Sequence, residues 1–148
     1  MKTKKLFQLL VVFTFFLASA NLFGQKKEKD KVLVNKTYTV EITETSAKKP
    51  KVINDEISFK AEKLNSKFMT AENAIPAALY TVSVDSTSDP KAITFQSEGK
   101  TADGLVVKWD GTVTGEAIDG TAVITNKKGK TVHEYSFTGT LKAKPGKK

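Results

Sequence analysis

Residues 109–124 read WDGTVTGEAIDGTAVI, and apolar residues alternate with polar ones on both sides of a central Gly115-Glu116 pair. A two-residue turn that begins with glycine is typical of a tight β-hairpin. With the turn placed there, all large apolar side chains fall on one face, because side chains of a strand alternate between its two faces. The opposed pairs are then Thr114 with Ala117, Val113 with Ile118, Gly111 with Gly120, and Trp109 with Ala122.

A final strand is predicted by the same argument, after a four-residue loop at 126–129. Tyr135 then lies opposite Gly120, and Phe137 lies opposite Ile118. An aromatic ring over a strand glycine restores the packing that the glycine lacks. The glycines are predicted to mark places where the sheet bends, and the alternative is that they leave space for a ligand.

The same period-two alternation runs along the chain from Val32 onward, which is typical of antiparallel strands with one buried face. One helical turn within 71–79 is the exception. The expected strands are 36–45, 51–60, 63–70, 78–85, 91–98, 104–114, 117–125 and 130–142. Eight short strands joined by short turns predict an all-β fold, an up-and-down meander that closes into a barrel. A two-sheet β-sandwich is the alternative.

The first 24 residues have the layout of a secretory signal peptide, with a lysine-rich start, an apolar run over 6–18 and the small-residue pattern Ala18-Ser19-Ala20. The run is shorter than the roughly 20 apolar residues that a membrane-spanning helix needs. Cleavage is expected after Ala20 or after Gly24. We therefore expect an exported protein, periplasmic or extracellular, without a transmembrane segment. Since the chain has no cysteine, disulfide bonds and a cysteine-linked lipid anchor are excluded.

The exported chain is expected to be one all-β domain, residues 35–142, between a flexible basic tail at 25–34 and a basic tail at 143–148. The formal net charge is +8, but residues 32–141 hold 13 lysines and 14 acids, so the excess cations lie at the ends. The chain has no arginine, the residue that suits bidentate phosphate contacts, and we expect no nucleic-acid partner. The tails are interpreted as solvated ends, with weak contact to anionic envelope surfaces as the alternative.

Residues typical of catalytic or metal sites are scarce. The chain has no cysteine, no Gly-x-Ser-x-Gly motif and one histidine, His133. One histidine makes no His cluster for zinc, and the acids beside the 115–116 turn lack the spacing of a calcium loop. We therefore expect no enzyme activity, no metal and no cofactor. His133 is predicted to share a face with Tyr135, either as a wall residue or as a ligand contact.

The C-terminal third carries a family resemblance. Residues 109–141, WDGTVTGEAIDGTAVITNKKGKTVHEYSFTGTL, resemble the last strands of small exported lipocalin-like (calycin-type) barrels and of a group of small secreted bacterial proteins. The matching residues are Trp109, Gly111, Val113, Gly115, Ile118, Gly120, Phe137, Gly139 and Leu141. The expected first strand, from Asn35, lacks the Gly-x-Trp motif of lipocalins. The resemblance implies a closed barrel that holds a small ligand.

The aromatic residues of the strands are the candidate ligand-binding residues, because in a closed barrel they point inward. The candidates are Phe59, Phe68, Tyr80, Phe95, Trp109, His133 and Tyr135. The leading hypothesis is an exported, non-enzymatic protein that holds a small apolar or amphipathic molecule in the barrel. The alternative is a structural or protein-interaction module of the cell envelope, with a filled core and no ligand.

Overall fold

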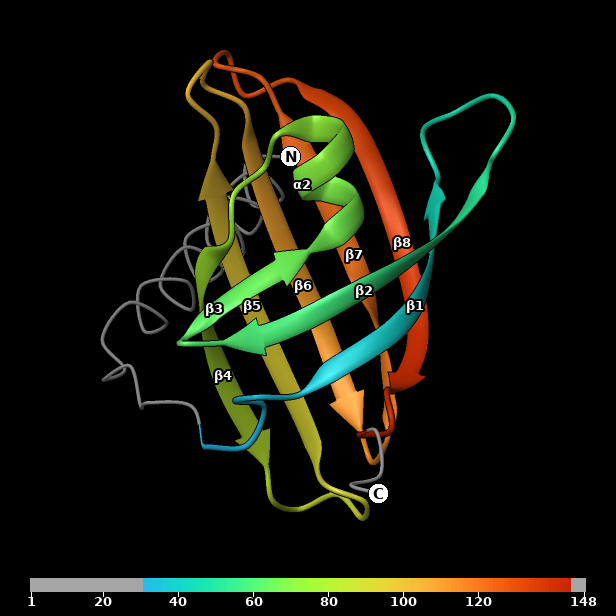
Figure 1. Ribbon diagram of the computed structural model, residues 1–148, viewed down its shortest axis with the longest axis vertical. Helices are drawn as coiled ribbons and strands as arrows, with labels where there is room; N and C mark the ends of the chain where they lie inside the picture. Colours follow the sequence, from blue (N-terminus) through green and yellow to red (C-terminus); the bar gives the residue numbers. More distant parts are fainter. Residues whose placement is uncertain (1–30, 145–148) are drawn as a thin grey trace, which may run out of the picture.

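The computed structural model describes residues 31–144, which form a closed barrel of eight antiparallel strands in chain order (Figure 1). Each strand pairs with the next, and the last pairs with the first, so the barrel prediction is confirmed over the sandwich. The elements are β1 (Thr37–Glu44), β2 (Val52–Lys60), β3 (Lys63–Ser66), α2 (Lys67–Asn73), β4 (Ala78–Asp85), β5 (Ala92–Lys100), β6 (Val106–Thr114), β7 (Ala117–Thr125) and β8 (Thr131–Leu141). The predicted signal peptide and the extreme C-terminus lie outside the described residues.

The hairpin predicted from residues 109–124 is confirmed pair by pair between β6 and β7. The register predicted for β8 is wrong by two residues, because Phe137 lies opposite Gly120 and Tyr135 lies opposite Ala122. The β7–β8 loop has five residues, and a bulge next to Thr125 adds another before the ladder continues. A shift of two residues leaves each side chain on its predicted face, since the period of a strand is two.

The strand predicted at 63–70 is wrong beyond Ser66, where the chain turns into α2. The Ser66 side chain accepts a hydrogen bond from the Met69 N–H at 3.1 Å, as a helix N-cap residue does. Ala74, with φ of 53°, ends the helix in the left-handed conformation. The helical turn predicted within 71–79 therefore overlaps only the last turn of α2.

Two apolar plugs close the ends of the barrel. α2 lies across the end at which β3 stops (Figure 1), and only the first two residues of β3, Lys63 and Leu64, pair with β4. It contributes the buried Met69, and the following loop contributes the buried Ile75. At the other end Leu33, within the predicted N-terminal tail, is fully buried in the core. The backbone N–H of Asn35 donates to the Phe59 carbonyl at 2.7 Å, which joins this segment to β2.

Within residues 31–144, no helix is both long and apolar enough to span a bilayer.

Candidate functional site

The barrel interior is built around Phe59 of β2. Its ring centroid lies 4.9 Å from that of Tyr80, 5.1 Å from that of Phe95 and 6.0 Å from that of Tyr38, all edge to face. Edge-to-face contacts at these distances are favourable because the positive ring edge meets the negative face. Phe59 is fully buried, and its three partners are buried as well. The rings therefore fill the barrel interior around Phe59 themselves.

The glycines of β6 and β7 make room for these rings. A Cβ atom on Gly120 would lie 2.7 Å from Cζ of Phe137 and 2.6 Å from the Cα of Gly111. A Cβ atom on Gly111 would likewise lie 2.8 Å from Cε1 of Phe95. Such contacts are closer than carbon atoms tolerate. The space that the strand glycines leave is thus occupied by the protein's own aromatic side chains.

The seven candidate residues form two groups. Phe137, which sequence reasoning did not select, links the first group, with its ring 6.4 Å from that of Phe95 and 5.7 Å from that of Trp109. The second group lies near α2, where the Tyr135 ring is 5.9 Å from Phe68 and 6.1 Å from His133. The members of the first group are Phe59, Tyr80, Phe95 and Trp109, and those of the second are Phe68, His133 and Tyr135.

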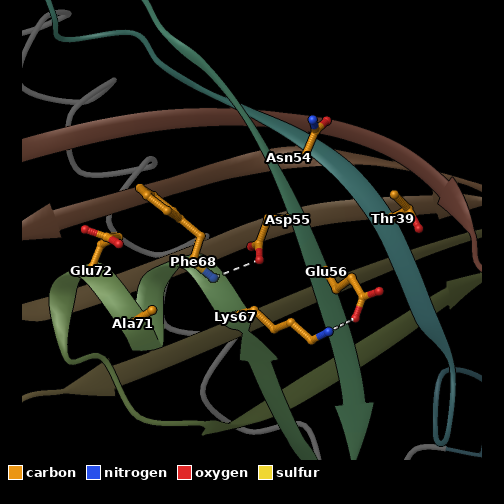
Figure 2. Close-up of a pocket in the computed structure, with 8 residues that line it drawn as sticks. All are labelled: Thr39, Asn54, Asp55, Glu56, Lys67, Phe68, Ala71 and Glu72. Atoms are coloured by element: carbon orange, nitrogen blue, oxygen red, sulfur yellow. Dashed lines mark hydrogen bonds and ion pairs between the residues drawn. The ribbon is translucent and has the colours of Figure 1, made fainter.

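A groove of about 460 Å³ runs between α2 and the neighbouring part of β2 (Figure 2). Phe68 is the one candidate residue that lines it. Six of the eight lining residues have polar side chains, and several of the eight are exposed. The lining residues are Thr39, Asn54, Asp55, Glu56, Lys67, Phe68, Ala71 and Glu72.

Asp55 is the buried acid of this groove, and its carboxylate stabilises the start of α2. One oxygen accepts from the Phe68 N–H at 2.8 Å (Figure 2), and the other accepts from the Ser66 hydroxyl at 2.5 Å. Asp55 is only 6% exposed. Its two carboxylate oxygens are engaged by the protein's own donors, so the structure gives Asp55 the role of a helix cap.

Glu56 points to the outside of the barrel and forms ion pairs with Lys67 and Lys142 (Figure 2 shows the first). The hydrogen bonds from Lys142 and then Lys67 lower the pKa of Glu56 from 4.5 to about 2. The pair with Lys142 joins the end of the chain's last strand to β2. Both pairs are partly exposed to solvent, so they connect elements at the surface.

His133 has a partner that sequence reasoning missed. Its Nδ1 lies 2.6 Å from Oε1 of Glu44, on the strand that closes the barrel against β8. The Ser46 hydroxyl also points at Glu44, at 3.4 Å, and accepts from the Glu134 N–H at 3.1 Å. The hydroxyl therefore faces the carboxylate rather than the imidazole, which is not the arrangement of a nucleophile and its base. These contacts hold the base of the β1–β2 hairpin against β8.

Tyr135 lies beside this pair, on the same face as His133 as predicted. Burial raises the pKa of Tyr135, the charge of Glu44 raises it further, and a hydrogen bond with Asn73 lowers it. Asp110 and Asp119 point outward, and Asp110 accepts from Gln96 at 3.0 Å. Within residues 31–144, no three His, Asp or Glu side chains gather in a way that could hold a metal ion.

Comparison with protein-family models, with curated proteins and with solved structures found no match to this chain.

Proposed function

We propose that this protein is an exported, non-enzymatic module of the cell envelope that acts through its outer surface. In this proposal its own side chains fill the interior of the barrel. The observation that carries the proposal is the packing of Phe59. Its ring contacts three other buried rings, so the barrel interior around Phe59 is occupied by the protein's own side chains. A barrel of eight strands is just wide enough for side chains to fill it.

The lipocalin-like hypothesis, with an apolar ligand inside the barrel, stays a prediction. Such a ligand would have to displace rings such as Phe95 and Phe137, which rest on the two glycines of β6 and β7. Because protein interiors are close-packed, moving these rings to make room for a ligand would cost free energy. The packing therefore favours the alternative in which the barrel is a rigid scaffold.

The non-enzymatic part of the proposal is supported by the contacts of His133. The imidazole is paired with Glu44 at a hairpin base, and its side chain is 41% exposed. A general base needs a substrate proton or a nucleophile within reach. The nearby Ser46 hydroxyl is directed at the carboxylate instead.

Protein purified from its own host distinguishes the two hypotheses. Native mass spectrometry is expected to give the mass of the processed polypeptide alone, and solvent extraction is expected to release no stoichiometric small molecule. A retained apolar molecule at a 1:1 ratio would contradict the filled barrel. The same spectrum shows whether the chain is cleaved after Ala20 or after Gly24.

Envelope fractionation tests the outer-surface part of the proposal. The protein is expected in envelope fractions of its host, and salt is expected to release it. A chain that ends at Lys142 is the matched variant, because it removes the rest of the basic tail and keeps the Lys142–Glu56 pair. Unchanged fractionation of this variant is expected if the barrel surface makes the contact. A protein found only in the soluble fraction would refute the proposal.

A further inference from the structure

Lysines gather in the loops at one end of the barrel, although residues 32–141 are almost neutral as a whole. β1 ends beside the start of β8, since Glu44 lies opposite Tyr135, so the loops at 45–51 and 126–130 belong to the same end (Figure 1). These two loops hold six lysines and no acid. The six are Lys48, Lys49, Lys51, Lys127, Lys128 and Lys130. We refer to the end of the barrel that carries them as the lysine end.

The other connections do not cancel this excess. At the lysine end, the connections from β3 to β4 and from β5 to β6 add Lys67 and two acids, Glu72 and Asp103. Lysines therefore exceed acids by five in the connections of this end. The turns of the opposite end carry Lys91 and three acids, which are Glu62, Asp89 and Glu116. The segments before β1 and after β8 also lie at the opposite end and add Lys31, Lys36, Lys142 and Lys144. Both ends therefore have more lysines than acids, and the excess is larger at the lysine end.

Hydrogen bonds order the 126–130 loop and the base of the 45–51 loop. The Asn126 side chain accepts from the N–H groups of Lys128 at 2.9 Å and Lys130 at 3.1 Å. At the base of the other loop, the Thr45 N–H donates to the Glu134 carbonyl at 2.8 Å. All six lysines are exposed, and none of them forms a salt bridge within residues 31–144. The Thr101 hydrogen bond and, more weakly, the charge of Lys127 lower the pKa of Asp103. The charge of the other five lysines is available to an external partner.

Two exposed valines accompany the lysines. Val52 directly follows Lys51 and is 58% exposed, and Val132 comes two residues after Lys130 and is 42% exposed. Val132 is exposed because it is the additional residue of the bulge in β8, between the paired Thr131 and His133. Apolar side chains beside cations are typical of surfaces that settle at the boundary between lipid headgroups and acyl chains. A soluble polyanion gives such valines no apolar partner.

All cationic side chains of the lysine end are lysines, and this also favours a lipid surface over a site-specific phosphate ligand. Arginine is the residue for bidentate, site-specific phosphate contacts, and this chain has none. Lysine acts as a point charge toward a diffuse anionic surface. Near an anionic bilayer each lysine strengthens binding by about fivefold. Six exposed lysines at one end are enough to attract the barrel to an anionic bilayer when that end faces the membrane.

We propose that the lysine end docks on an anionic phospholipid bilayer, with the six lysines among the headgroups and Val52 and Val132 inserted shallowly beside them. This inference rests on the proposed action through the outer surface and identifies which surface acts and on what. It is independent of the tails, because both tails lie outside the loops that carry the lysines.

Vesicle sedimentation tests the proposal with the exported form of the protein. Binding is expected to phosphatidylglycerol vesicles, not to phosphatidylcholine vesicles, and it should disappear at 1 M salt, where the Debye length is about 3 Å. Replacing Lys127, Lys128 and Lys130 by Gln should weaken binding by about a hundredfold. The matched control replaces Lys60, Lys63 and Lys91 by Gln, which removes the same charge elsewhere on the barrel and should change binding by less than about threefold.

A second pair of variants tests the valines. Val52→Thr with Val132→Thr keeps the β-branched shape and should weaken vesicle binding by about threefold or more. Val84→Thr is the control, because Val84 is exposed at the other end of the barrel and should bind as the parent does. Circular dichroism shows whether each variant is folded.

Three outcomes would overturn the docking proposal. The first is an equal loss in the loop and control lysine variants, which would make net charge the cause. The second is unchanged binding of the loop variants, which would assign the contact to the tails. The third is no vesicle binding but salt-sensitive binding to heparin, which would make the lysine end a polyanion site. Envelope association that persists in any of these cases would leave the proposed function standing and refute the docking alone.

Discussion

The carboxylate of Asp55 accepts the backbone N–H of Phe68 at 2.8 Å, across 13 residues of sequence. The same carboxylate accepts the hydroxyl of Ser66, which in turn accepts the N–H of Met69. The last residue of β3 and the first turn of α2 thus depend on one buried acid from β2. These hydrogen bonds explain why the chain leaves the sheet after Ser66 and closes the end of the barrel with a helix.

Asp55→Ala is predicted to destabilise the fold by about 3 kcal/mol, because it leaves the buried Ser66 hydroxyl and the part-buried Phe68 N–H without an acceptor. Urea denaturation followed by circular dichroism measures the loss. Asp119→Ala is the control, since Asp119 is exposed on β7, and it should change the free energy of unfolding by less than about 0.5 kcal/mol. Equal losses in the two variants would contradict the capping role.

Gly120→Ala is predicted to cost about 3 kcal/mol, because the new Cβ would collide with backbone atoms of β6 and with the ring of Phe137. Thermal or urea unfolding of the variant gives the loss. The neighbouring Thr121 is exposed, and Thr121→Ala should cost less than about 1 kcal/mol. If Gly120→Ala were as mild as Thr121→Ala, the close approach of the two strands and the ring would be refuted.

Phe59→Ala is predicted to cost about 4 kcal/mol and to open a dry apolar cavity, because three buried rings lose their common neighbour. Such cavities bind small apolar molecules. Nuclear magnetic resonance titration with benzene should therefore show binding to the variant and none to the parent protein. Phe68→Ala, at the half-buried rim, should cost less and create no enclosed site. Binding of benzene inside the parent barrel would favour the ligand hypothesis.

The contribution of Glu56 to stability is predicted to fall in acid. Its pKa is lowered from 4.5 to about 2 by Lys142 and then Lys67, so the folded state favours the charged carboxylate. A lowered carboxyl pKa stabilises the fold above the ordinary value, and this stabilisation is lost as the pH falls from about 4.5 to about 2. Urea denaturation at several pH values should show the parent more stable than Glu56→Gln at pH 6, with the difference shrinking toward pH 2.

Solvent screening makes this difference small, and salt should reduce it further, because both ion pairs are exposed. Glu41→Gln is the matched control on β1, where the carboxylate forms no salt bridge within residues 31–144. Its stability should follow that of the parent at every pH. A Glu56 difference that grew as the pH fell would contradict the sign of the pKa shift.

The strands, their faces and the hairpin registers with two-residue turns could be predicted from local sequence. The pair of Phe59 with Leu64 illustrates this, since the short turn at 61–62 leaves one register that buries both side chains. The β8 register could not be predicted, because a bulge next to Thr125 added a residue without any change in the pattern of buried faces. The alternation of apolar and polar residues determines which side chains of a strand are buried. It does not change when the register shifts by two residues.

Part of the candidate site could also be predicted from the sequence. The alternation identified which aromatic residues point inward, as Phe59, Phe95 and Trp109 do. It did not show that these rings contact one another, because their contacts join strands far apart in the chain. The pairing of His133 with Glu44 spans 89 residues and has no local signal. The burial of Leu33, in a segment rich in lysine, has none either.

The sequence by itself determined an all-β chain of eight alternating strands, because period-two patterning and turn chemistry act over a few residues. Only the tertiary structure decided that β8 closes on β1, that the interior is filled by rings, and that two lysine loops 80 residues apart share one end. The physical reason is that closure fixes which loops meet, and no local pattern contains that information. A chain that is nearly neutral over residues 32–141 thereby acquires one strongly basic end.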